Sequence, residues 1–126
     1  MIRVISTANA PTPRGHYSQA VVANGLVFVA GQVAIDPKTQ EPKPGPIEEQ
    51  THQVLANLAA ILDAAGTTIE RVVKTTVYLS DMSLFGRVNE VYAEFFGDHC
   101  PARAIVPVRE LRNGLQVEIE AIALAE

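Results

Sequence analysis

The sequence predicts an α+β fold in which two helices pack on one face of a mixed β-sheet. Two segments place apolar residues at helical spacing, and several short runs are rich in β-branched residues. Two Asn-Gly pairs separate such runs and indicate tight turns. The predicted order is strand, strand, helix, strand, helix, strand, strand, with each helix crossing between parallel strands.

The first hairpin is predicted at Asn24-Gly25, between the runs Tyr17–Ala23 and Leu26–Val33. A two-residue turn that matches the twist of its strands needs positive φ at both central residues, and Asn and Gly tolerate this conformation. The two runs are therefore expected to pair as antiparallel strands.

Two helices and a strand follow along the chain. The first helix is predicted at about Ile47–Ala65, with Gly66 as its C-terminal cap. The run Val72–Leu79 is dense in β-branched and aromatic residues and predicts a strand. Ser80-Asp81 then supplies turn and cap chemistry for a second helix that ends near Gly97.

A second hairpin is predicted to close the chain. The runs Arg103–Val108 and Leu115–Ala123 are apolar enough for strands, and Asn113-Gly114 lies between them. A two-residue turn here would place Arg109 opposite Glu118.

Both faces of the predicted sheet carry apolar residues. In the second strand, Val27 and Val29 point to one face, whereas Leu26 and Phe28 point to the other. Two helices can cover only one face, so the second face is expected to pack against further copies of the chain.

The composition fits a single globular domain spanning residues 1–126, with 48% hydrophobic and 19% charged residues. The single Cys100 excludes an intramolecular disulfide and indicates a reducing compartment. A formal net charge of −4 without basic runs argues against a nucleic-acid partner. No segment resembles a signal peptide or a membrane span, so we expect a soluble cytoplasmic protein.

Motifs for cofactor or metal chemistry are absent from the sequence. It has no glycine-rich phosphate loop and no nucleophile elbow. His16, His52 and His99 lie too far apart for a local metal motif. We therefore expect no cofactor and no metal.

Three charged residues interrupt apolar strands: Arg103, Glu118 and Glu120. In the predicted closing hairpin they share one face, with Pro107 opposite Glu120 and Arg103 opposite Leu124. Arg103 would then lie roughly 20 Å along the strand from the position facing Glu118, at about 3.3 Å per residue. Arg103 and Glu118 are thus expected to meet only across a subunit boundary.

The first hairpin would add polar groups, because Tyr17 would face Gln32 and Gln19 would face Ala30. Together with an arginine for a carboxylate and a glutamate for proton transfer, these groups suggest a small anion pocket. A second interpretation stays open: Tyr17 is a rim residue, the glutamates are solvated, and Arg103 forms a plain ion pair.

Motifs with a distinctive residue order cover nearly the whole chain. They are Gly15–Ala20, Ala30–Gln32, Val73–Leu79, Val88–Phe96, Pro101–Arg103 and Val117–Ala123. Together they closely resemble the RidA/YjgF family of imine and enamine deaminases, also called the L-PSP family. The resemblance implies a chorismate-mutase-like fold, a homotrimer with a central β-barrel, and three clefts between subunits.

The resemblance also implies roles for individual residues. Arg103 matches the arginine that binds the substrate carboxylate, Tyr17 a pocket tyrosine, and Glu118 the glutamate that positions or activates water. Asn89 and Gly31 match recurrent pocket positions.

The chain departs from the best-known subfamily at His16, Ala30, Cys100, Ile105 and Arg112, where proline, serine, phenylalanine, cysteine and proline are usual. At the substrate pocket, Ala30 and Ile105 would remove two polar atoms and make the site more apolar.

The implied reaction is hydrolysis of 2-aminoacrylate, 2-iminopropanoate or 2-iminobutanoate to a 2-keto acid and ammonia. 2-Aminoacrylate first tautomerises to a 2-imino acid. Water then attacks the electrophilic C=N carbon, so positioning and proton transfer suffice. Three alternatives remain. A non-catalytic regulatory module would bind small carboxylates through the same Arg103. An endoribonuclease or translation inhibitor is disfavoured by the acidic charge. A holdase-like chaperone is not addressed by the sequence.

Overall fold

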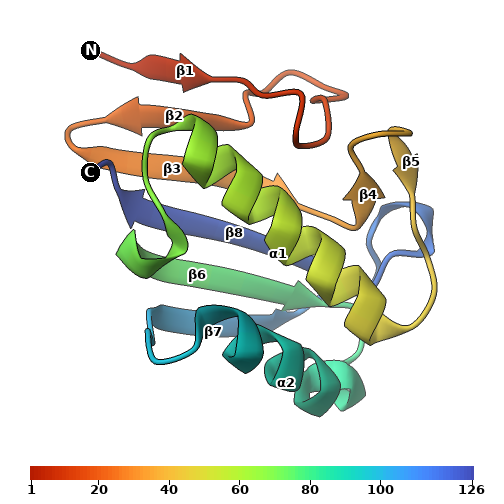
Figure 1. Cartoon of the computed structure of the whole chain (residues 1–126). Helices are drawn as coiled ribbons and strands as arrows, with labels where there is room; N and C mark the ends of the chain where they lie inside the picture. Colours follow the sequence, from red (N-terminus) through yellow and green to blue (C-terminus); the bar gives the residue numbers. More distant parts are fainter.

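The computed structural model describes residues 1–126 and contains a six-stranded mixed sheet (Figure 1). In spatial order its strands are β1 (Arg3–Ile5), β2 (Ala20–Ala23), β3 (Leu26–Gln32), β8 (Val117–Leu124), β6 (Val72–Leu79) and β7 (Ala102–Pro107). Only β6 and β7 are parallel neighbours. A separate two-stranded ribbon joins β4 (Ile35–Asp36) to β5 (Glu41–Pro42). The predicted α+β class with a mixed sheet is confirmed.

Two helices, α1 (Ile47–Ala64) and α2 (Phe85–Phe96), lie on the same side of the sheet (Figure 1). The chain leaves α1 through Gly66, whose φ of +83° suits the predicted cap position. Between α1 and the sheet lies the centre of the hydrophobic core, in which Leu58, Ile61 and Leu62 are fully buried. No helix is long and apolar enough to cross a membrane.

The first predicted hairpin is confirmed, but its first strand begins later in the sequence than predicted. Asn24 and Gly25 have φ values of 52° and 78°, and Ala23 pairs with Leu26. Regular pairing begins at Ala20, however, so Tyr17 belongs to the preceding loop and not to the strand.

The predicted closing hairpin is wrong, because β6 lies between β7 and β8. Asn113 and Gly114 do have the positive φ values of a tight turn, 58° and 72°. They belong instead to a short 3₁₀ turn, Arg112–Gly114, on the connection from β7 to β8. Because α2 returns the chain to the free side of β6, β7 pairs there in parallel and leaves the other side of β6 to β8.

The pairs expected from that hairpin are consequently absent: Arg109 with Glu118, Pro107 with Glu120, and Arg103 with Leu124. The observed partner of Arg103 on β6 is Thr75. Tyr78 and Thr76 pair with Glu118 and Glu120.

The observed register places Arg103 and Glu118 on opposite faces of the sheet. Side chains alternate along a strand, and Thr75 and Tyr78 are an odd number of positions apart on β6. Arg103 therefore lies on the face covered by the helices, and Glu118 on the face without helices. The expectation that they share a face is wrong.

The face without helices carries the second set of apolar side chains that the sequence predicted. Phe28 and Leu124 retain 40% and 41% of their accessible surface, and Val4 retains 62%. Phe28 and Ile122 are paired across β3 and β8, so these side chains lie on adjoining strands.

Candidate functional site

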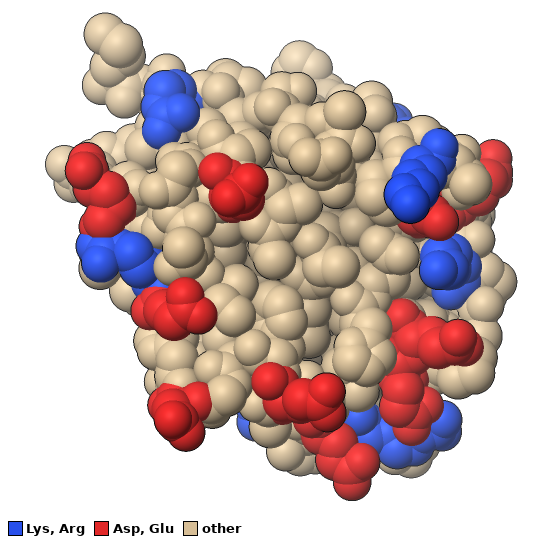
Figure 2. All heavy atoms as spheres, in the orientation of Figure 1, with Lys and Arg blue, Asp and Glu red and all other residues tan.

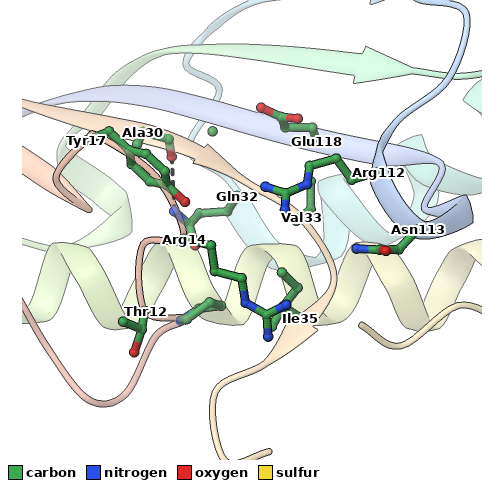
Figure 3. A pocket seen from close by; sticks show the side chains of 12 residues that line it. Thr12, Arg14, Tyr17, Ala30, Gln32, Val33, Ile35, Arg112, Asn113 and Glu118 are labelled. Atoms are coloured by element: carbon green, nitrogen blue, oxygen red, sulfur yellow. Dashed lines mark hydrogen bonds between the residues drawn. The ribbon is translucent and has the colours of Figure 1, made fainter. Parts of the chain in front are cut away.

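Six of the seven predicted site residues line one of two cavities. The first, here called the Glu118 cavity, has a volume of about 320 Å³ (Figure 3). Its lining residues are Pro11, Thr12, Arg14, Tyr17, Ala30, Gly31, Gln32, Val33, Ile35, Arg112, Asn113 and Glu118. Four of the seven predicted site residues therefore share this cavity: Tyr17, Ala30, Gly31 and Glu118.

The side chain of Glu118 lies across the backbone of Gly31. Regular pairing of β3 with β8 is interrupted between Val29 and Gln32, next to this contact. A β-carbon on Gly31 would overlap Oε2 of Glu118 and lie 2.9 Å from its Cδ. Only glycine leaves space for the carboxylate in this position.

Two effects hold the pKa of Glu118 above its ordinary value. Burial of the carboxyl is the larger, and the negative charge of nearby Glu120 is the second. A carboxyl that is harder to ionise is a stronger base once ionised, so Glu118 suits proton transfer from water.

Tyr17 reaches the same cavity from a loop that is stabilised by Gln19. The amide nitrogen of Gln19 donates to the carbonyl oxygens of Thr7, Ala10 and Pro11, at 3.0, 3.3 and 2.9 Å. Its amide oxygen accepts from the Thr7 backbone at 2.7 Å. Gln19 is only 2% exposed, so its amide stabilises the loop and does not face a ligand as the hairpin model implied.

Gln32 is the amide that does line the Glu118 cavity, where it donates to the carbonyl oxygen of Ala30 at 3.2 Å (Figure 3). Two arginines also line it that the sequence did not place in a site, Arg14 and Arg112. Both come from irregular segments, where no periodic pattern marks a side chain as cavity-facing. Arg112 stood out in the sequence only as a departure from proline.

The second cavity, here called the Arg103 cavity, has a volume of about 350 Å³. Its lining residues are Asn89, Tyr92, Ala93, Phe96, Gly97, His99, Cys100, Pro101 and Arg103. It contains the two predicted site residues that α2 and β7 contribute, Asn89 and Arg103.

Side chains of α2 fix the position of the Arg103 guanidinium. Its Nη1 donates to Oδ1 of Asn89 at 2.8 Å. Its central carbon lies 4.8 Å from the ring centre of Tyr92 and 5.5 Å from that of Phe85. The Tyr92 hydroxyl is itself 2.7 Å from Oγ1 of Thr75, which fixes the ring. The remaining N–H groups of Arg103 have no partner in the chain and are available for a planar anion.

Ile105 is the one predicted site residue that lines neither cavity. It is half-buried and packs against the hydrophobic core. Its side chain therefore contributes to the stability of the fold, and its place in the substrate pocket stays a prediction.

No group of three or more His, Cys, Asp or Glu side chains is close enough to hold a metal ion. His16 and His52 are exposed, and Nε2 of His99 lies 2.7 Å from the carbonyl oxygen of Val72. The polar groups of the two cavities are suited to anion binding and to proton transfer.

Comparison with known proteins decides the family. Residues 7–125 match the family model described as Endoribonuclease L-PSP. The chain belongs to the L-PSP family, also called RidA/YjgF. The resemblance found in the sequence is confirmed over nearly the whole chain.

Individual members of the L-PSP family are similar over their full length. A RutC family protein of Pyrococcus horikoshii is 54% identical over 126 residues, covering 100% of both chains. A Mus musculus protein named 2-iminobutanoate/2-iminopropanoate deaminase is 48% identical over 122 residues, which cover 97% of this chain and 90% of that protein. The crystal structure of E. coli TdcF with bound serine has a TM-score of 0.92 and 38% identity, covering 97% and 98% of the two chains.

Proposed function

We propose that this protein hydrolyses reactive 2-imino and enamine acids, such as 2-aminoacrylate, 2-iminopropanoate and 2-iminobutanoate, to 2-keto acids and ammonia. The observation that carries the proposal is the fixed orientation of the Arg103 guanidinium. Asn89 and the rings of Tyr92 and Phe85 hold it in place, and most of its N–H groups stay free to bind an anion. Support also comes from the mouse relative named as a deaminase of such acids. The TdcF structure holds serine, which carries a carboxylate and a nitrogen on one carbon as the imino acids do.

In the proposed reaction, the guanidinium of Arg103 binds the substrate carboxylate through two parallel hydrogen bonds. Glu118 accepts a proton from water as the water oxygen bonds to the C=N carbon. That proton passes to the nitrogen and gives a carbinolamine. The hydroxyl proton then also passes to the nitrogen, the C–N bond breaks as the C=O bond forms, and ammonia leaves a 2-keto acid. Tyr17, at the edge of the Glu118 cavity, donates a hydrogen bond that orients the substrate.

This mechanism requires Arg103 and Glu118 at one ligand, and within a single chain they lie on opposite faces of the sheet. We therefore propose a homotrimer in which the Glu118 cavity of one subunit adjoins Arg103 of the partner subunit. The exposed apolar side chains on the face without helices, including Phe28 and Leu124, support burial against other copies. The three such faces would form a central β-barrel.

The surface supports a small-molecule substrate over RNA. On the helix side, acidic and basic side chains alternate around the periphery and form no basic patch (Figure 2). The net charge of −4 also disfavours a phosphate backbone.

The test generates 2-iminobutanoate in situ with a threonine dehydratase and follows 2-oxobutanoate formation with and without the protein, with light scattering on the same sample. We expect faster formation of the keto acid and about three times the chain mass. An unchanged rate would overturn the proposed hydrolysis, and binding of 2-oxobutanoate without acceleration would favour the regulatory module. A stable monomer that retained activity would overturn the shared site.

A further inference from the structure

Two cationic side chains in the Glu118 cavity have no function in the reaction described above. Arg14 comes from the loop between β1 and β2, and Arg112 comes from the 3₁₀ turn before β8. Neither side chain donates a hydrogen bond within the chain. Neither takes part in an ion pair, because the one ion pair within 4.0 Å in the chain joins Arg87 to Glu48. Both guanidiniums are therefore available to a ligand.

The two arginines border one space from different sides. Figure 3 shows the Arg112 guanidinium directed into the space bordered by Gln32 and Glu118, and Arg14 on the side of the cavity away from Glu118. Two separate loops thus direct positive charge toward one volume of about 320 Å³.

The charge of this cavity contrasts with that of the whole chain. Its lining has two guanidiniums and one carboxylate, whereas the chain has a formal net charge of −4. With Glu118 ionised, the two guanidiniums still leave one net positive charge on the lining. A cavity with excess positive charge favours an anionic group.

We propose, building on the proposed deaminase function, that Arg14 and Arg112 bind a second anionic group at the far end of the substrate. The preferred substrates are then dicarboxylic 2-imino acids, of which 2-iminosuccinate and 2-iminoglutarate are the simplest. Arg103 of the partner subunit binds the carboxylate next to the C=N carbon, and the arginine pair binds the side-chain carboxylate. An alkyl side chain offers neither guanidinium an anionic partner, whereas a side-chain carboxylate can accept hydrogen bonds from both.

The reaction itself is the same hydrolysis. Water adds to the C=N carbon of 2-iminosuccinate, the C–N bond breaks, and oxaloacetate and ammonia are released. No oxidant or reductant is consumed. An amino-acid oxidation that converts an acidic amino acid to its imine is the class of reaction that would supply this substrate.

The test compares two imines formed in situ by amino-acid oxidases in the presence of catalase: 2-iminosuccinate from aspartate and 2-iminobutanoate from 2-aminobutanoate. The quantity measured is the ratio of kcat/KM for the dicarboxylic to the monocarboxylic imine. We expect a ratio of about ten or more for the natural sequence, and an approximately tenfold fall in that ratio in the double variant Arg14→Gln, Arg112→Gln. The matched control is Arg109→Gln, which removes an exposed arginine from the same connection outside the cavity and leaves the ratio unchanged.

A second measurement separates this proposal from the proposed hydrolysis. Calorimetry compares the affinities for 2-oxoglutarate and 2-oxobutanoate in the natural sequence and the double variant. Tighter binding of 2-oxoglutarate that the double variant loses supports the second anion site even where no imine is turned over. Turnover of 2-iminobutanoate with no preference for 2-iminosuccinate, or a preference that survives in the double variant, overturns the second anion site and leaves the deaminase function standing.

Discussion

The carboxylate of Glu118 lies against the backbone of Gly31 so closely that no β-carbon fits between them. The contact joins two neighbouring strands, β8 and β3, at the place where their regular pairing is interrupted. It fixes a partly buried carboxyl at the wall of a cavity, beside the loop that carries Tyr17. The absence of a side chain at Gly31 therefore determines the position of the proposed base.

Gly31→Ala should displace the Glu118 carboxylate and lower kcat/KM by about a hundredfold, since a shift of roughly 1 Å in a catalytic group has an effect of this order. The fold should survive, because the far end of the glutamate side chain can rotate away. Activity and thermal unfolding would be measured on the same preparation.

Gly86→Ala is the matched control for that substitution. Gly86 lies in α2, and a β-carbon there meets nothing within 4 Å. The variant should keep full activity and be at least as stable as the natural sequence, because alanine has a higher helix propensity than glycine. Normal kcat/KM in Gly31→Ala would show that the position of Glu118 is unimportant for catalysis.

The dependence of the rate on pH should follow the ionisation of Glu118. A general base acts when ionised, so kcat/KM should rise with pH through a pKa above the ordinary 4.5 of a glutamate. Glu120→Gln removes one cause of the raised pKa, and the rising limb should move to lower pH. Glu118→Gln should lower the rate and abolish this limb, and the exposed Glu70→Gln should leave it in place.

The same raised pKa predicts an effect on stability with a defined sign. The folded protein holds the Glu118 proton more tightly than the unfolded chain does, so this group disfavours folding as pH rises through its folded pKa. Glu118→Gln should therefore raise the unfolding temperature at neutral pH and have little effect below the ordinary pKa. A pH-independent change would contradict the raised pKa.

The ion pair between the two helices predicts a stability effect of the opposite sign. Nε and Nη2 of Arg87 donate to the two carboxylate oxygens of Glu48 at 2.7 and 2.8 Å, which joins α2 to α1. This contact lowers the pKa of Glu48 from 4.5 to about 2. The stabilisation is therefore present above the unfolded pKa and is lost as pH falls from about 4.5 toward about 2.

Thermal unfolding of the natural sequence and of Arg87→Gln would measure this effect. The natural sequence should unfold at a slightly higher temperature at neutral pH, and the difference should vanish near pH 2. Added salt should reduce the difference, because both side chains reach solvent. A difference that stayed constant with pH would assign the effect of Arg87 to packing.

Local signals in the sequence were sufficient to predict most elements of the fold. The turn at Asn24-Gly25, the strand Val72–Leu79 and the end of α1 at Gly66 each depend on the conformational preferences of adjacent residues. The prediction of a closing hairpin was wrong because the positive φ values of Asn113-Gly114 do not determine strand pairing. They fit a strand that pairs with the preceding strand, and they fit equally the observed β8, which lies on the other side of β6 from β7. Only the return of the chain through α2 decides between the two.

The same error in strand order also led to a wrong relative placement of two site residues. The sequence alone singles out Arg103 and Glu118, because a charged residue is unusual in an apolar strand. It also singles out Tyr17, an aromatic residue with a polar group next to the first hairpin. The face on which Arg103 lies depends on strand order, so the sequence placed it wrongly relative to Glu118. Arg14 and Arg112 were missed because irregular loops have no repeat from which the direction of a side chain can be inferred.

Arg103 provides the sharpest test of the proposed carboxylate site. Arg103→Ala removes two charge-assisted hydrogen bonds, each contributing roughly 1.5–3 kcal/mol, so affinity for 2-oxobutanoate should fall by about a hundredfold or more. Turnover of 2-iminobutanoate should fall at least as far, because the C=N carbon is no longer oriented toward Glu118. The exposed Arg71→Ala is the matched control and should change neither quantity.

Arg103→Lys distinguishes a geometric clamp from simple charge attraction. Lysine retains the positive charge, but it lacks the planar pair of donors that Asn89 and the Tyr92 ring hold in place. A geometric clamp predicts that Arg103→Lys loses most of the affinity and turnover lost in Arg103→Ala, whereas charge attraction alone predicts substantial retention. The Arg103 side chain is exposed in the chain, so all variants should keep the same mass by light scattering. Full turnover by a folded Arg103→Ala protein of unchanged mass would remove Arg103 from the mechanism.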